Sequence, residues 1–209
     1  MKKIPFILVC LCLIASPVFA FGPAIQAVVG ASSTPAGCTT GAESCAASTT
    51  SSYGCLQSSA QVYLASKFVA EATETVCSAV LRMKRSTDTD PTHSYNVYIY
   101  SNSCTTCDRS DDNVGSVVGT GSTNSITYAA NLTTTEADVT FTGISASITS
   151  GEVYWVVLKG TGTVDSTNYG LWGCSTGCTT EDFHRDAADG EGAWGSVSAT
   201  YGGKYTLYK

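Results

Sequence analysis

The sequence predicts an all-β fold, an antiparallel β-sandwich of jelly-roll type with about 8–10 strands. From residue 61 onward, short runs of β-branched and aromatic residues are separated by polar turns. Only 13% of the residues are charged, and Ser, Thr and Gly abound, a composition that suits sheets and turns. Hardly any segment has the spacing of an amphipathic helix. Together these observations indicate one sandwich.

The run Val153–Leu158 is expected to form the central strand. It is β-branched and aromatic, carries no charge and follows a glycine turn at Gly151. Since successive strand residues point to opposite faces, both faces of this strand are apolar. We therefore expect a strand that is covered on both sides, with Trp155 in the core.

Further strands are expected on either side of this run. The segment 95–100 should point Val97 and Ile99 inward and two tyrosines outward, and residues 138–142 alternate as a half-buried edge strand does. The expected strands, in chain order, are 63–69, 76–84, 95–100, 114–119, 125–129, 138–142, 169–173, 194–197 and 205–208.

Residues 1–20 resemble a signal peptide. Two lysines precede an apolar run, Ile4–Ile14, and a small residue, Ala20, stands where cleavage is expected. The alternative is a membrane anchor, but an uninterrupted span needs about 20 apolar residues, and this run is shorter and broken by Pro5 and Pro17. The sequence therefore predicts an exported chain, secreted or at the cell surface, whose mature part does not insert into a membrane.

The remaining chain divides into two parts. Residues 21–60 are rich in Ala, Ser, Thr and Gly and are expected to form a cysteine-bearing arm, and residues 61–209 the sandwich domain. The formal net charge is −6, which disfavours nucleic acid and anionic membrane surfaces as partners. A calcium ion or a neutral ligand such as a glycan fits this charge better.

Cysteine usage agrees with export, because an even number of cysteines outside the signal peptide is typical of disulfides. Spacing favours local bridges between Cys104 and Cys107 and between Cys174 and Cys178, with the other four tying the arm to the first strands. The alternative is a zinc site of four thiolates from these two short motifs. The eight cysteines are Cys38, Cys45, Cys55, Cys77, Cys104, Cys107, Cys174 and Cys178.

Several hydrophobic patterns recur in a known order: Ala79–Met83, Tyr95–Ser101, Ile148–Leu158, a Tyr-x-x-Trp at Tyr169, and a terminal aromatic strand. In these the chain resembles the choice-of-anchor R type β-sandwich of bacterial surface and exported proteins, over about residues 61–209. That module is similar in architecture to carbohydrate-binding modules. The resemblance implies an exported, non-catalytic module and supplies no catalytic residues.

Two further motifs bear on chemistry. Gly173–Gly177 fits the G-x-S-x-G nucleophile pattern, but that pattern needs a strand-to-helix turn in an α/β sheet, so we attribute it to chance. Asp186, Asp189 and Glu191 form an acidic turn that suits structural calcium, with solvated turn acids as the alternative. No other cofactor is expected.

Aromatic residues are the stronger indication of function. Trp172 and Trp194 flank the cysteine-rich and acidic loops, with Tyr169 nearby, and exposed rings of this kind stack on sugars. The alternative is that both tryptophans plug one end of the sandwich. The sequence thus predicts a non-catalytic binding module for a glycan or cell-surface component. A self-associating structural subunit of an extracellular layer or fibre is the second hypothesis, and a small secreted hydrolase the third.

Overall fold

The computed structural model describes residues 38, 40–44, 51–57, 62–89, 92–104, 113–175, 183–186, 194–198 and 202–209. The predicted signal peptide and most of the predicted arm lie outside these residues. Within the described part of the chain, no helix is long and apolar enough to cross a membrane. The predicted fold class is confirmed, because two antiparallel sheets pack face to face and nearly every described element is a strand.

Sheet A has a branched order, since the long strand β4 pairs with β8 along one edge and with β14 and β10 along the other. Among the described residues its strands are β1 (Thr40–Ser44), β2 (Ser51–Cys55), β4 (Glu74–Arg85), β8 (Ala137–Ile148), β10 (Gly170–Ser175), β13 (Gly202–Gly203) and β14 (Tyr205–Tyr208).

Sheet B runs in the order β12-β11-β3-β9-β5-β6, with β7 beside β5. Its described strands are β3 (Tyr63–Val69), β5 (Ser94–Ser103), β6 (Asn113–Val117), β7 (Ile126–Thr127), β9 (Val153–Thr161), β11 (Phe183–Asp186) and β12 (Gly195–Ser198). A single helical turn, α1 (Tyr128–Asn131), follows β7.

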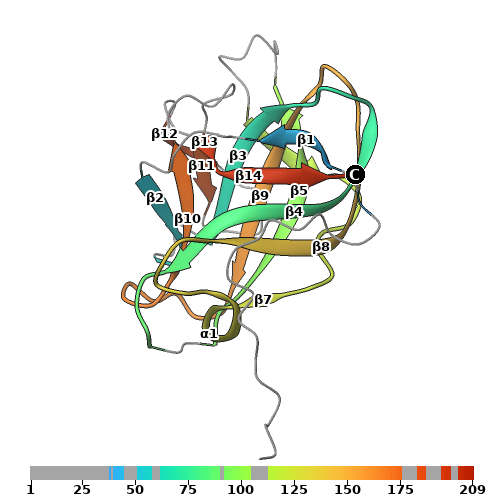
Figure 1. Cartoon of the computed structure of the whole chain (residues 1–209). Coiled ribbons are helices and arrows are strands. Elements are labelled where there is room, and N and C mark those ends of the chain that lie inside the picture. The colour runs from blue at the N-terminus through green and yellow to red at the C-terminus, as the bar shows by residue number, and fades with distance from the viewer. Residues whose placement is uncertain are drawn as a thin grey trace, which may run out of the picture.

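The two sheets cross at a steep angle. In Figure 1, β4, β8 and β14 run across the strands β3, β5 and β9 of the other sheet. From β3 to β5 and from β8 to β10, consecutive strands alternate between the sheets, as expected for a jelly-roll type of sandwich. The main core lies between the sheets and includes Phe68, Leu81, Phe141, Val156 and Leu158.

The predicted central strand is confirmed. β9 lies between β3 and β5, and it pairs with β3 from Val153 to Lys159. Val156 and Leu158 belong to the core between the sheets, whereas Trp155 and Val157 belong to a second buried cluster on the outer face of sheet B. An apolar pattern on both sides of a strand thus corresponds to burial on both sides.

The predicted edge strand is also confirmed. β8 has β4 on one side, and residues 118–124 cover part of its other side. Thr120 and Ser145 exchange backbone hydrogen bonds of 3.0 and 3.1 Å, and the backbone N–H of Thr123 donates to Thr142. The same segment reaches sheet B, where Ser122 donates its N–H to Val97. This side of the sandwich is therefore closed by backbone hydrogen bonds to both sheets.

Two expectations differ from the structure. The segment 21–60 is not only an arm, because β1 pairs with β14 and β2 pairs with β10, so the sandwich begins before residue 61. Backbone pairing does not require apolar side chains, which is why a polar segment can supply strands. The expected strand 125–129 ends at Thr127, where the chain enters α1. With β1, β2, β11 and β13, the described residues contain more strands than the sequence predicted.

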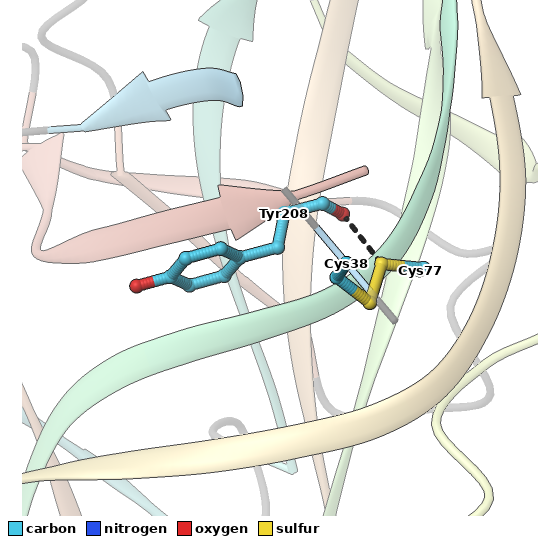
Figure 2. The surroundings of a disulfide bond; sticks show 3 residues. All are labelled: Cys38, Cys77 and Tyr208. Carbon is cyan, nitrogen blue, oxygen red and sulfur yellow. Dashed lines mark hydrogen bonds between the residues drawn. A yellow bond between two sulfur atoms is a disulfide. The ribbon is translucent and has the colours of Figure 1, made fainter. Parts of the chain in front are cut away.

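A disulfide links this N-terminal part of the chain to the sandwich. Cys38 is bonded to Cys77 of β4, 39 residues further along the chain. Figure 2 shows the Cys77 sulfur beside the backbone oxygen of Tyr208, at 3.2 Å. The bridge therefore fixes the start of the described chain next to its last strand, as expected for cysteines that tie the arm to the first strands.

Candidate binding pocket and its supporting aromatic face

The outer face of sheet B carries a second set of aromatic residues, which we call the outer aromatic cluster. The outward residues of β3, β9 and β5 stand in rows: Lys67 is opposite Trp155, and Trp155 is opposite Tyr100. The rings of this cluster are those of Tyr63, Tyr98, Tyr100, Trp155 and Trp194.

Trp194 lies across this face, edge-on to its neighbours. Its ring centroid is 6.2 Å from that of Tyr63 and 6.4 Å from that of Tyr100, with interplanar angles of 74° and 71°. Ala65 and Val157 are opposite one another in the register and belong to the same cluster, and their small side chains leave room for a large ring above them. Edge-to-face packing of this kind contributes beyond the area that it buries.

Two lysines extend over these rings. The Lys159 ammonium lies 5.4 Å from the centre of the Tyr63 ring and 6.0 Å from that of Tyr98. The Lys67 ammonium lies 5.8 Å from the centre of the Trp155 ring. At these distances a cation is attracted to the face of an aromatic ring. The outer face of sheet B is therefore an ordered, packed layer.

Asn102 connects the outer aromatic cluster to the end of β5. The indole N–H of Trp155 donates to Oδ1 of Asn102 at 3.1 Å, and the backbone N–H of Asn113 donates to the same oxygen at 3.2 Å. Because Trp155 is fully buried, this hydrogen bond holds the Asn102 side chain in one position.

A pocket of about 260 Å³ opens beside Asn102. On one side it is lined by Ser101, Asn102 and Cys104 at the end of β5, and on the other by residues 151–154 at the start of β9. Since β5 and β9 are antiparallel neighbours, the end of one meets the beginning of the other. We call this the β5–β9 pocket. The polar residues of its lining are Ser101, whose hydroxyl bonds to the Ser116 backbone, Asn102, whose Oδ1 accepts the two hydrogen bonds above, and Glu152.

The turn before β9 is held in place by backbone hydrogen bonds to Ala70. The N–H of Gly151 donates to the Ala70 oxygen at 2.7 Å, and the Ala70 N–H donates to the Glu152 oxygen at 2.9 Å. Gly151 has φ of +84°, in the left-handed region that glycine adopts without strain. A Cβ at this position would meet no atom within 4 Å. The turn is thus fixed in its backbone and open at its side-chain positions.

Glu152 is exposed, and its carboxylate forms no hydrogen bond or ion pair with the described residues. It is also the one charged side chain among the described residues that line the pocket. Within the described part of the chain, the fold therefore makes no use of this carboxylate.

The structure does not support the predicted tryptophan site. Trp172 is fully buried in the core between the sheets, where its indole N–H donates to the Lys204 oxygen at 3.0 Å. Trp194 is 7% exposed and lies on the opposite face of sheet B, in the outer aromatic cluster. The stacking prediction is wrong for both rings, because each is packed against other side chains. The alternative, that both tryptophans plug one end of the sandwich, agrees with their burial only, because the two rings lie in separate layers.

Tyr169 is also in a different place from the other two predicted residues. It is half-buried just before β10, and its hydroxyl accepts a hydrogen bond from Nε2 of Gln57 at 3.3 Å. Its backbone N–H donates to Oγ of Ser86 at 2.9 Å. Tyr169 therefore connects loops through its hydrogen bonds.

The disulfide predictions have mixed outcomes. Cys38 and Cys77 are bonded to each other, and Cys104 is disulfide-bonded, which excludes it as a thiolate ligand of the alternative zinc site. Cys55 and Cys174 carry free thiols, so the predicted bridge from Cys174 is wrong. The remaining predicted cysteines, Cys45, Cys107 and Cys178, lie outside the described residues.

Geometry also keeps the two free thiols apart. Cys55 pairs with Gly170 and Cys174 with Ser51, so the two cysteines stand four residues apart along their ladder, about 13 Å. A disulfide requires Cα atoms within about 7 Å. Burial raises the pKa of the Cys174 thiol to about 11 and raises that of Cys55 further, so both thiols are protonated and unreactive at neutral pH.

The predicted calcium site falls largely outside the described residues. Asp186 is the last residue of β11, but its side chain lies outside the described part of the chain. Asp189 and Glu191 lie outside it as well. Within the described part of the chain, no group of three or more His, Cys, Asp or Glu side chains is placed to hold a metal ion.

The first three residues of the G-x-S-x-G match, 173–175, lie on a strand. Gly173 and Ser175 belong to β10, and Ser175 is 1% exposed. His93, one of the two histidines, is buried elsewhere and bonds through Nε2 to the Thr163 oxygen at 2.6 Å. A nucleophile needs an accessible hydroxyl beside a base, and Ser175 has no access to solvent.

The residues of the β5–β9 pocket were not predicted from the sequence. One signal was present: a Gly-Glu turn stands directly before the central strand, and Asn102 stands just after the strand at 95–100. In an antiparallel sheet those two positions meet only if the two strands are neighbours, and sequence alone does not give strand order.

No family model matches this chain, and comparisons with curated proteins and with solved structures give no match either.

Proposed function

We propose that this chain is an exported, non-catalytic β-sandwich module that binds a carbohydrate in the β5–β9 pocket. The observation that carries the proposal is the polar pocket between Asn102 and Glu152, built on two antiparallel strands and a turn fixed by Ala70. Sugar hydroxyls both donate and accept hydrogen bonds, so a small pocket lined by polar residues such as Ser101, Asn102 and Glu152 suits them.

Rigidity of the pocket wall supports binding. The side chain of Asn102 is held by Trp155, whose ring is packed in the outer aromatic cluster. A site whose polar groups are already positioned loses less conformational entropy when a ligand binds. The outer aromatic cluster thus acts as a support for the pocket, in place of the exposed stacking surface expected from the sequence.

The lining chemistry favours a binding module over a hydrolase. Glycoside hydrolysis generally requires two carboxyl groups about 5–10 Å apart across the scissile bond. Glu152 is the one carboxylate among the described lining residues, and no described histidine lies beside it. Within the described lining, this carboxylate has no second carboxyl group of the kind that such hydrolysis needs.

Strand edges favour ligand binding over assembly by strand addition. The long edge of β8 is partly covered by residues 118–124, and the edge strands β1, β2, β6 and β12 have four or five residues each in the described chain. Long uncovered edges are the ones that pair between copies. The disulfide Cys38–Cys77 and the disulfide-bonded Cys104 are in keeping with export.

A glycan array probed with the purified protein tests this proposal. We expect saturable binding to one class of sugar. Gly151→Asn should lower the affinity at least tenfold, because it places a side chain in the open space at the pocket. Asparagine tolerates the positive φ of this position. Glu152→Ala should also weaken binding, and Glu71→Ala is its matched control, because Glu71 is exposed and does not line the pocket.

The result that contradicts the proposal is equally specific. If a folded wild-type protein binds no sugar on the array, or if Gly151→Asn binds as tightly as wild type, the β5–β9 pocket is not a carbohydrate site. Near-ultraviolet circular dichroism of each variant shows whether its aromatic packing is intact.

A further inference from the structure

We infer that the Cys38–Cys77 disulfide is a redox-sensitive latch that holds β1 on β14. β1 is an edge strand of sheet A, with β14 beside it. When the bridge is reduced, β1 leaves β14 while the rest of the sandwich stays folded. The latch belongs to sheet A and does not depend on the β5–β9 pocket or on its ligand.

β1 is attached to the sheet mainly through its backbone. Its five residues, Thr40–Ser44, have the sequence TGAES, which contains no large apolar side chain. Among the described elements, β14 is the one with which β1 makes extensive contact, and the register of this pair is irregular between Thr40 and Ser44. A short strand that buries little apolar surface opens more easily than the strands of the core.

β2 comes from the same polar segment but is attached in a different way. It pairs with β10 in unbroken register from Ser51 to Cys55. Cys55 and Leu56 at its end are buried in the core between the sheets, and β2 also contacts β3 and β9 of sheet B. β2 is therefore held by packing as well as by pairing, and it serves as an internal reference for β1.

The disulfide lies where β1 begins. Cys38 stands just before Thr40, and Thr40 is opposite Tyr208 in the register. The Cys77 sulfur lies 3.2 Å from the Tyr208 oxygen, as Figure 2 shows. The bond therefore keeps the start of β1 beside its partner strand, and it removes much of the conformational freedom that β1 would gain by leaving.

Opening of the latch requires a dithiol from outside the chain. A thiolate of the dithiol attacks one sulfur and breaks the S–S bond, and its second thiol resolves the mixed disulfide. Cys38 and Cys77 receive two electrons and two protons and become thiols, while the dithiol becomes a disulfide. Both cysteines of the bridge are half-buried, whereas the free thiols of Cys55 and Cys174 are fully buried. The reduced Cys77 can donate to the Tyr208 oxygen, which favours continued pairing of β4 with β14.

The state of the latch decides whether one edge of sheet A is covered. β14 pairs with β1 on one side and with β4 on the other. Without β1, the backbone groups of β14 that face it lose their partner strand, and unpaired edges are prone to pair with other chains. In an oxidising compartment the bridge persists, so the edge stays covered.

Hydrogen exchange followed by mass spectrometry measures the latch. The oxidised protein is compared with the same protein in dithiothreitol and with the double variant Cys38→Ser, Cys77→Ser. We expect exchange in residues 40–44 to become about tenfold faster or more in both samples, while exchange in residues 51–55 changes less than about twofold. The double variant should give the same result with and without dithiothreitol. Because it keeps the disulfide of Cys104, an effect common to both samples belongs to the Cys38–Cys77 bridge.

Near-ultraviolet circular dichroism shows whether the sandwich is still packed in each sample. A retained aromatic signal, with fast exchange confined to β1, supports the latch. If β1 stays as protected as in the oxidised protein, or if β1 and β2 lose protection together, the inference is overturned. Loss of the aromatic signal in both samples overturns it as well, because the bridge would then hold the whole sandwich. If the double variant alone loses this signal, the exchange of the reduced wild-type protein decides.

Discussion

The outer faces of the two sheets differ although the same alternation of side chains produces both. On sheet A, Arg82 and Asp138 are paired across β4 and β8 with Nη1 and Oδ1 3.1 Å apart, and Lys84 lies 3.7 Å from Glu136. These four side chains are partly exposed. On sheet B the equivalent outward positions carry the outer aromatic cluster, which is largely buried.

This difference shows which outer face contributes to the stability of the protein beyond its main core. Partly exposed ion pairs contribute about 0–1 kcal/mol each, because water already solvates both charges. A buried aromatic side chain contributes several times more through burial and packing. The outer face of sheet B therefore behaves as a second core, and the β5–β9 pocket is built on its margin.

The largest expected effect tests whether the outer aromatic cluster is a true core. Trp155→Ala should lower the free energy of unfolding by about 3–5 kcal/mol, because it removes a fully buried ring and leaves a cavity. Arg82→Ala, on the outer face of sheet A, should lower it by less than about 1 kcal/mol. Urea denaturation followed by circular dichroism measures both, and a similar loss in the two variants would remove the distinction between the faces.

A smaller effect tests the space beneath Trp194. Ala65→Leu should destabilise the protein by about 1–3 kcal/mol, since the added atoms press against rings that are already in contact. Thr140→Leu is the matched control, because Thr140 alternates with buried Val139 and Phe141 and therefore points outward from sheet A. We expect that variant to unfold within about 0.5 kcal/mol of wild type. Equal stability of Ala65→Leu and wild type would show that Trp194 does not pack on this row.

The smallest effect concerns the ion pair itself. A double-mutant cycle of Arg82→Ala and Asp138→Ala should give a coupling energy of about 0.2–1 kcal/mol that falls in about 0.5 M salt. The cycle is measured by urea denaturation at two salt concentrations. A coupling energy above about 2 kcal/mol, unchanged by salt, would mean that the outer face of sheet A is as well shielded from water as that of sheet B.

The local pattern of apolar and polar residues was sufficient to predict the strands that have such a pattern. The expected strands 63–69 and 205–208 agree with β3 and β14 at both ends, and the central strand Val153–Leu158 lies inside β9. β1 and β2 were not predicted, because their residues are small and polar and their pairing comes from the backbone of distant strands. Hydrogen bonds of the backbone leave no signature in side-chain periodicity.

The candidate site was harder to predict from the sequence than the strands were. Tryptophans near cysteine-rich and acidic loops suggested a stacking surface, yet Trp172 and Trp194 are both packed against other side chains. The pocket instead joins Asn102 to Glu152, two residues that are 50 positions apart in the chain and carry no shared motif. Their proximity depends on β5 and β9 being neighbours.

By itself, the sequence determined the all-β class, the central strand with two apolar faces and the polar edge strand. These follow from side-chain alternation, which is a property of each strand alone. The tertiary structure decided which cysteines bond, on which side of sheet B each tryptophan lies, and where the pocket forms. Those outcomes depend on strand order and register, which bring distant residues within a few ångströms and leave no local pattern in the chain.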